Sequence, residues 1–100
     1  MNNVALLVRL EAKPGKEQEV EDFLRSALPL AQQETLTTTW FALRLGTSSF
    51  GIFDSFPGND ARQAHLNGPI AAALMAKAGE LLTEPPSIEM VDILAVKVPS

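Results

Sequence analysis

Two segments near the ends of the chain are apolar at nearly every position. They run from Val4 to Glu11 and from Ile88 to Val98. A strand that keeps one face in water alternates between apolar and polar residues. Because neither segment alternates in this way, we expect two strands of a sheet that is covered on both faces.

Three segments between these strands have the pattern of helices. From Glu17 to about Gln33, apolar residues recur at the spacing of one buried helix face, and Pro29 predicts a kink inside this helix. A shorter helix is expected from about Asn59 to Asn67. Gly68 would end it in a left-handed conformation, and Pro69 would begin an alanine-rich helix that runs to about Thr83.

The middle of the chain predicts a β-hairpin. Its strands run from Thr37 to Leu45 and from Phe50 to Phe56, and the turn between them is Gly46-Thr47-Ser48. Side chains alternate between the two faces of a strand. The first strand therefore has one face with Trp40, Ala42 and Arg44 and another with Phe41, Leu43 and Leu45. The second strand has one face with Phe50, Ile52, Asp54 and Phe56 and another with Gly51, Phe53 and Ser55.

The order of these elements is β-α-β-β-α-β, with the second helical segment broken at Gly68-Pro69. This order predicts an α+β, ferredoxin-like sandwich in which helices cover one face of a four-stranded antiparallel sheet. Residues 1–100 are expected to form one domain. The other sheet face is also apolar, so we expect a homodimer in which two sheets pack together as an α+β barrel.

Composition excludes several classes of function. The net charge is −4 and no basic run occurs, which argues against nucleic acid as a partner. The chain has no cysteine and one histidine, so we expect no metal site. No apolar run approaches the roughly 20 residues that span a membrane. The first four residues lack the basic region of a signal peptide, and a cytoplasmic protein is the default expectation.

Two titratable residues near the hairpin are the candidate acid and base groups. His65 can exchange a proton near neutral pH; the alternative is a histidine that is hydrogen-bonded to backbone on a helix surface or between helices. Asp54 lies in a strand among apolar residues, where a carboxylate needs a partner. It is either a general base for a phenol or quinol proton or the partner of Arg44 in an ion pair across the hairpin.

Aromatic side chains of the same region could line a pocket between the sheet and the helices. A flat aromatic ligand could stack on them, although aromatic residues on strands also serve as ordinary core. Met75 and Met90 are expected to fill the core, unless a large pocket leaves Met75 in its wall. The candidate ligand-binding residues are Trp40, Phe41, Phe53, Phe56, Arg44 and Met75.

Three stretches of the sequence resemble the antibiotic biosynthesis monooxygenase family. They are VRLEAKPGKEQEVEDFL near the N-terminus, TTTWFALRLG with FGIFDSFPG in the hairpin, and QAHLNGPIAAAL in the following helices. The resemblance covers nearly the whole chain. It implies a dimeric α+β barrel and, for some members, a monooxygenase that needs no cofactor because the aromatic substrate itself gives electrons to oxygen.

The resemblance does not extend to the haem-degrading members of this family. Those proteins pair an asparagine of the first strand with a tryptophan of the third strand and a histidine of the next helix. His65 matches the histidine, but Ser55 stands near the tryptophan position and Leu7 and Val8 stand near the asparagine position. The function we expect is therefore a monooxygenase for a small aromatic or quinol-type molecule, with His65 and Asp54 as acid/base groups. The alternatives are a dimer that binds a small apolar molecule without turning it over, as in a stress-associated protein, and a purely structural dimer.

Overall fold

The computed structural model describes residues 3–99, which form four strands and three helices. The strands are β1 (Val4–Glu11), β2 (Thr39–Arg44), β3 (Ser49–Phe56) and β4 (Ser87–Asp92), and the helices are α1 (Glu17–Gln33), α2 (Asn59–Leu66) and α3 (Pro69–Leu81). Pro29 lies inside α1, which continues to Gln33 as the sequence predicts.

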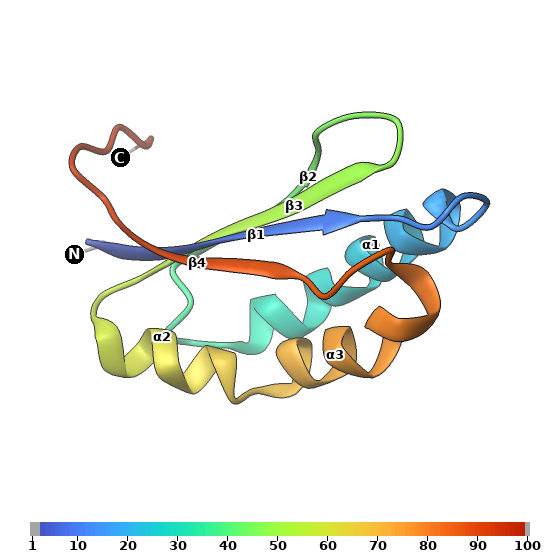
Figure 1. Cartoon of the computed structure of the whole chain (residues 1–100). Helices are drawn as coiled ribbons and strands as arrows, with labels where there is room; N and C mark the ends of the chain where they lie inside the picture. The colour runs from blue at the N-terminus through green and yellow to red at the C-terminus, as the bar shows by residue number, and fades with distance from the viewer. Residues whose placement is uncertain (1–2, 100) are drawn as a thin grey trace.

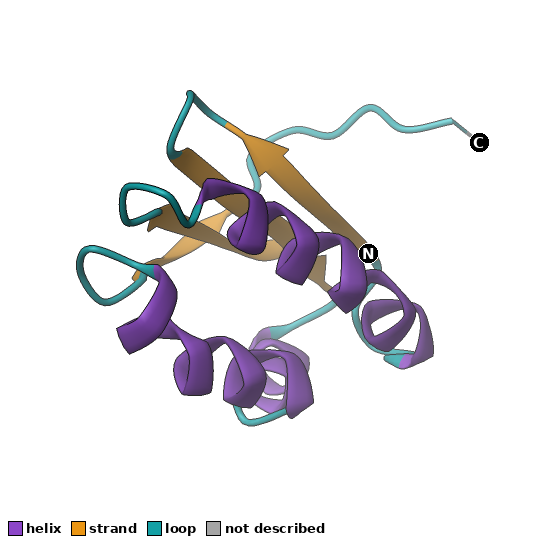
Figure 2. Cartoon of the chain, turned by 90° about the vertical axis from the view of Figure 1, so that its right-hand side faces the viewer, coloured by secondary structure: helices purple, strands orange, loops and turns teal. Residues whose placement is uncertain are grey.

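The four strands form one antiparallel sheet in the order β2-β3-β1-β4. All three helices lie on one side of this sheet, below it in the view of Figure 1, and the turned view of Figure 2 shows the same two layers. The element order, the one-sided helical layer and the break at Gly68-Pro69 agree with the predicted ferredoxin-like α+β fold.

The core lies between the sheet and the helices. Its main cluster joins Val8 and Leu10 of β1 and Phe50 and Ile52 of β3 to apolar residues of α1 and α3. The buried stripe of α1 consists of Val20, Leu24, Ala27 and Ala31, and that of α3 consists of Ile70, Leu74, Ala78 and Leu81. Burial of each large side chain here contributes about 1.5–3 kcal/mol.

The second face of the sheet carries apolar side chains that the described residues leave partly exposed. Phe41 of β2 and Phe53 of β3 are cross-strand partners on this face, with ring centroids 6.4 Å apart, and Phe41 is 53% exposed. Leu45, at the end of the hairpin strand, is 48% exposed. We call this surface the free face.

The last strand is shorter than the sequence predicts. We expected it to continue to Val98, but β4 ends at Asp92, which pairs with Val4, the first residue of β1. After the backbone hydrogen bond from Ile93 to Asn3, residues 94–99 have no neighbouring strand and leave the sheet as a tail. Figure 1 shows this tail rising over the free face.

Gly68 also differs from the expectation. Its φ is −94°, so it does not adopt the left-handed conformation. Its role is steric: a Cβ atom at this position would lie 3.2 Å from the carbonyl oxygen of His65. The close approach of α2 to α3, and not a positive φ, therefore favours glycine here.

Candidate functional site

His65 lies between two carboxylates in the helical layer. Its Nδ1 donates a hydrogen bond of 2.6 Å to Oε1 of Glu34, and its Nε2 lies 2.9 Å from Oδ2 of Asp54. Asp54 is 1% exposed and His65 is 8% exposed. Three elements that are distant in sequence thus contribute one titratable cluster, which we call the acid/base cluster: Glu34, Asp54 and His65.

The backbone of the fold positions each member of this cluster. Asp54 belongs to β3 and points toward the helices, as the alternation along the strand predicts. His65 lies in the last turn of α2, with its ring 5.3 Å from the ring of Phe56. Glu34 is the residue at which α1 ends, and the hydroxyl of Thr37 donates a 2.7 Å hydrogen bond to the same Oε1 that accepts from His65.

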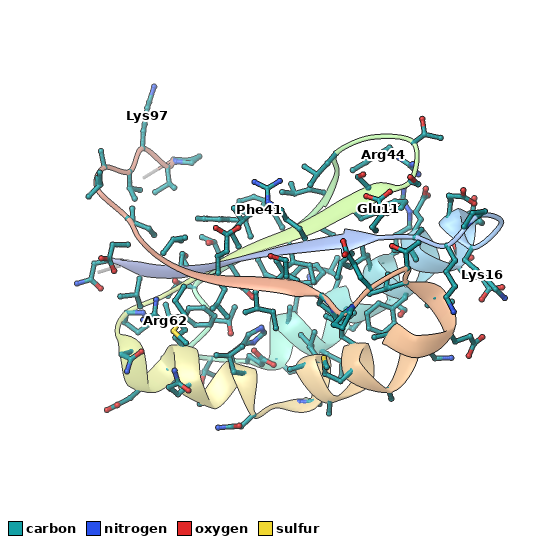
Figure 3. All side chains as sticks on the ribbon, viewed as in Figure 1. Glu11, Lys16, Phe41, Arg44, Arg62 and Lys97 are labelled. Carbon is teal, nitrogen blue, oxygen red and sulfur yellow. The ribbon has the colours of Figure 1, made fainter. Side chains whose placement is uncertain are left out.

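Arg62, one helical turn before His65, links α2 to the sheet by hydrogen bonds. Its guanidinium donates to the carbonyl oxygens of Ala5 and Val91, at 3.2 and 3.3 Å, and to the side chain of Asn59. Figure 3 shows Arg62 between α2 and the sheet. Because Arg62 and His65 are three residues apart, they lie on the same side of the helix, and the anchor at Arg62 directs the imidazole toward β3.

The two carboxylates favour a protonated imidazole. An ionised carboxylate can only accept hydrogen bonds. The carboxylate oxygen beside each ring nitrogen is therefore best matched by an N–H on that nitrogen. Burial by itself would lower the pKa of His65, but the close contact with the Asp54 carboxylate, the hydrogen bond to Glu34 and the charges of both acids together raise the pKa above the ordinary value of 6.5. The arrangement can therefore hold a proton near neutral pH and release it when a neighbouring charge changes.

Several buried polar atoms around the cluster have no hydrogen-bond partner among the described residues. They include Oε2 of Glu34, both carboxylate oxygens of Asp54 and Nε1 of Trp40. Oδ2 of Asp54 is near enough to the imidazole for an ion pair, but the ring N–H is poorly aligned for a hydrogen bond. Trp40 is the cross-strand partner of Asp54. Buried polar atoms normally have partners, so this concentration marks the cluster as a functional candidate.

A surface hollow of about 290 Å³ reaches the acid/base cluster from outside. Glu34 and His65 form part of its wall, but Asp54 does not. The remaining lining residues are largely small or apolar and come from the end of α1, the segment after it, α2 and the start of α3: Gln33, Thr35, Leu36, Thr37, Ala61, Ala64, Gly68 and Pro69.

The expected ion pair between Arg44 and Asp54 is wrong. Arg44 pairs with Glu21 of α1, and its guanidinium lies 4.8 Å from the centre of the Phe50 ring. Asp54 is opposite Trp40 on the neighbouring strand, and Arg44 lies four residues farther along β2, a distance of about 13 Å at the rise of a β-strand. Arg44 therefore lies away from the acid/base cluster.

The four aromatic candidates do not line one cavity. Trp40 and Phe56 lie on the helix-facing side of the sheet, where Phe56 is buried. Phe41 and Phe53 lie on the free face, as Figure 3 shows for Phe41. The alternation of the strand separates the two pairs, so Phe41 and Phe53 are unable to shape a pocket between the sheet and the helices.

The two methionines are not core residues. Met75 is 55% exposed on α3, and Met90 is 58% exposed on the edge strand β4. Neither lines the hollow beside His65. The helical stripe of α3 turns Ile70 and Leu74 inward, which leaves Met75 on the outer side of the helix.

Glu34 is the member of the cluster that sequence reasoning missed. No motif connects it to a histidine 31 residues away. Its position just after a helix, followed by Thr35, gives no signal of its own. The tertiary fold alone brings it to His65.

Two further properties limit the kinds of site. Among residues 3–99, no group of three histidine or acidic side chains, the acid/base cluster included, has an arrangement that could hold a metal ion. No helix in that range combines the length and the apolar composition needed to cross a bilayer.

Comparisons with known proteins identify structures that share this fold. No family model and no curated protein matches the chain. Among solved structures, the NE2512 protein of unknown function from Nitrosomonas europaea is 61% identical, with a TM-score of 0.97 over 100% of this chain and 97% of that one. Rv0793 from Mycobacterium tuberculosis is 18% identical, with a TM-score of 0.83 over 96% of this chain and 99% of that one.

A third structure carries the name of the predicted family. It is called an antibiotic biosynthesis monooxygenase and is 14% identical, with a TM-score of 0.78 over 92% of this chain and 99% of that one. At this identity the likeness shows the fold, and it confirms the resemblance found in the sequence. The chain therefore belongs to one family with the NE2512 protein and has the fold of the antibiotic biosynthesis monooxygenases.

Proposed function

We propose that this protein is a homodimeric monooxygenase that needs no cofactor and acts on a small aromatic or quinol-type molecule. One observation carries the proposal: His65 bridges two carboxylates at the wall of a hollow that also has apolar lining residues. Such a cluster can take a proton from a phenolic hydroxyl, and the likeness to a structure named as a monooxygenase supports oxygen as the second reactant.

The chemistry requires only a proton acceptor from the protein. A phenol that loses its O–H proton becomes a phenolate, which gives electrons to O₂ more readily. For a phenol with a free ring position opposite the hydroxyl, one oxygen atom of O₂ enters the ring as a carbonyl and the other leaves as water. The ring C–H bond and the O–H bond are lost, so that phenol and O₂ give quinone and water, with O₂ as the oxidant.

The proposed dimer rests on the free face and on the tail. Phe41 and Leu45 expose apolar surface there, and Leu94 of the tail is 97% exposed. The tail and the free face enclose a second hollow of about 290 Å³, which is mainly apolar. A second copy of the chain supplies the same apolar surface, which is the self-complementarity that a twofold interface needs.

Oxygen uptake tests the proposed activity. The protein would be incubated with menadiol or with 1-naphthol, whose ring position opposite the hydroxyl is free. We expect uptake above the uncatalysed rate, with losses of about 100-fold to 10,000-fold in His65→Ala and Asp54→Asn. Met75→Ala, an exposed position away from the hollow, is the control. Equal rates in all four proteins would rule out the acid/base roles, and binding without uptake would favour the non-catalytic dimer.

A further inference from the structure

We propose that Glu34, and not His65 or Asp54, is the residue that meets the hydroxyl group of a phenolic ligand. The inference rests on the proposed function and assigns the substrate-facing end of the acid/base cluster. The positive charge of His65 would offset the charge of Glu34, and Asp54 would help to keep the imidazole protonated.

The imidazole has no nitrogen left for a ligand. Nδ1 is hydrogen-bonded to Glu34 and Nε2 faces Asp54, so neither nitrogen can accept a ligand proton without losing a carboxylate neighbour. Asp54 is 1% exposed and lies outside the lining of the hollow. A molecule in the hollow therefore meets no free ring nitrogen of His65 and does not contact Asp54.

Glu34 has one buried oxygen without a hydrogen-bond partner among the described residues. Its Oε1 accepts from both His65 and Thr37, whereas its Oε2 has no hydrogen-bond partner. A buried acceptor without a donor is destabilising, and more so when the group is charged. A ligand hydroxyl that donates to Oε2 would recover this cost, while a ligand without a donor would not.

Gly68 lies beside this oxygen, which is itself buried. It lines the same hollow, and a Cβ atom at residue 68 would lie 3.7 Å from Oε2 of Glu34, in van der Waals contact. Because Oε2 is buried, a hydroxyl group reaches it only when the wall of the hollow shifts, and the absence of a side chain at Gly68 leaves room for that shift. The charged groups that face His65 among the described residues are Asp54 from β3 and Glu34 from the end of α1.

The proton transfer balances within the cluster. The O–H bond of the phenol breaks, its proton forms a bond to Oε2 of Glu34, and the electron pair stays on the phenolate. Glu34 becomes neutral, and the imidazolium of His65 remains paired with Asp54. The total charge is unchanged, and the positive ring lies beside the new phenolate, where it is stabilising.

A binding cycle without oxygen tests the inference. The two probes are 1-naphthol, which can donate a hydrogen bond, and 1-methoxynaphthalene, which cannot. Binding is followed through the NMR signals of the imidazole, which are unambiguous because His65 is the only histidine. We expect the wild type to bind 1-naphthol at least about tenfold more tightly than the ether. Glu34→Gln should bind both with similar affinity.

Two further variants keep the result decisive. Met75→Ala changes an exposed residue of α3 outside the hollow and should retain the preference for 1-naphthol. Gly68→Ala keeps the carboxylate but places a methyl group 3.7 Å from Oε2 and 3.2 Å from the carbonyl oxygen of His65, so it should weaken the preference without removing the acid. A wild type without the preference, or a preference that stays intact in either Glu34→Gln or Gly68→Ala, would overturn the assignment of Glu34.

The outcomes separate this inference from the proposed activity. If the binding cycle gives the expected pattern but no oxygen is consumed, Glu34 recognises the hydroxyl and the monooxygenase proposal fails. If oxygen is consumed but Glu34→Gln keeps the preference for 1-naphthol, the activity stands and the inference fails.

Discussion

Nε2 of His65 lies 2.9 Å from Oδ2 of Asp54, and this contact joins the last turn of α2 to the middle of β3. Both side chains are buried, so the ion pair lies in a region of low polarity where an unpaired charge is costly. The pair and the hydrogen bond to Glu34 together determine how stability and ionisation respond to substitution.

Removal of the imidazole should destabilise the fold. His65→Ala leaves the Asp54 carboxylate buried without a positive partner, and breaking a buried ion pair in this way costs about 3–5 kcal/mol. Urea unfolding followed by the fluorescence of Trp40, the only tryptophan, would measure the loss. The same substitution in an Asp54→Asn background should lower the free energy of unfolding by clearly less, because residue 54 then carries no charge that needs a partner. Equal losses in both backgrounds would contradict the ion pair.

Stability should fall as the pH rises above neutrality. The pKa of His65 is raised in the folded protein, so the folded state holds the proton more tightly than the unfolded chain. This stabilisation is complete below the ordinary value of 6.5 and is lost as the pH rises through the raised pKa. Urea midpoints between about pH 6 and about pH 9 would show the decline. His65→Gln, which does not titrate, should remove this component; an unchanged decline would assign it to other groups.

Two glycines should respond in opposite directions to alanine. At Gly51 of β3, a Cβ atom would lie 3.0 Å from the carbonyl oxygen of Val8 and 3.3 Å from Leu45, so Gly51→Ala should cost about 1–3 kcal/mol. At Gly79 of α3, a Cβ atom meets nothing within 4 Å, and Gly79→Ala should add about 0.5–1 kcal/mol of helix stability. Thermal unfolding of both variants would check the pair. Stabilisation at Gly51 would show that β1 and β3 can move apart.

A charge on the free face should separate the proposed dimer. Phe41→Glu introduces a carboxylate where we propose that two sheets meet, and burying it there would be costly. Light scattering after size-exclusion chromatography should show a dimer for the wild type and a monomer for the variant. Met75→Glu alters a residue of similar exposure in the helical layer and should stay dimeric. A monomeric wild type at micromolar concentration would refute the dimer.

Local patterns were enough to predict the architecture. The apolar spacing of α1, the Gly46-Thr47-Ser48 turn and the break at Gly68-Pro69 each depend on residues close together in sequence, and the structure agrees with all three. The length of β4 was different, because a strand ends where its neighbour ends, and that neighbour is at the other end of the chain.

For the functional site too, local sequence predicts one part and the tertiary structure decides the rest. The sequence alone determined that His65 lies on the helix after the hairpin and that Asp54 faces inward from its strand, since both follow from local periodicity. Only the tertiary structure decided that Asp54 contacts His65 and not Arg44, that Phe41 and Phe53 lie on the opposite face, and that Glu34 completes the cluster. These contacts join residues 11 to 31 positions apart, and their geometry depends on how the helices pack on the sheet, which no local pattern encodes.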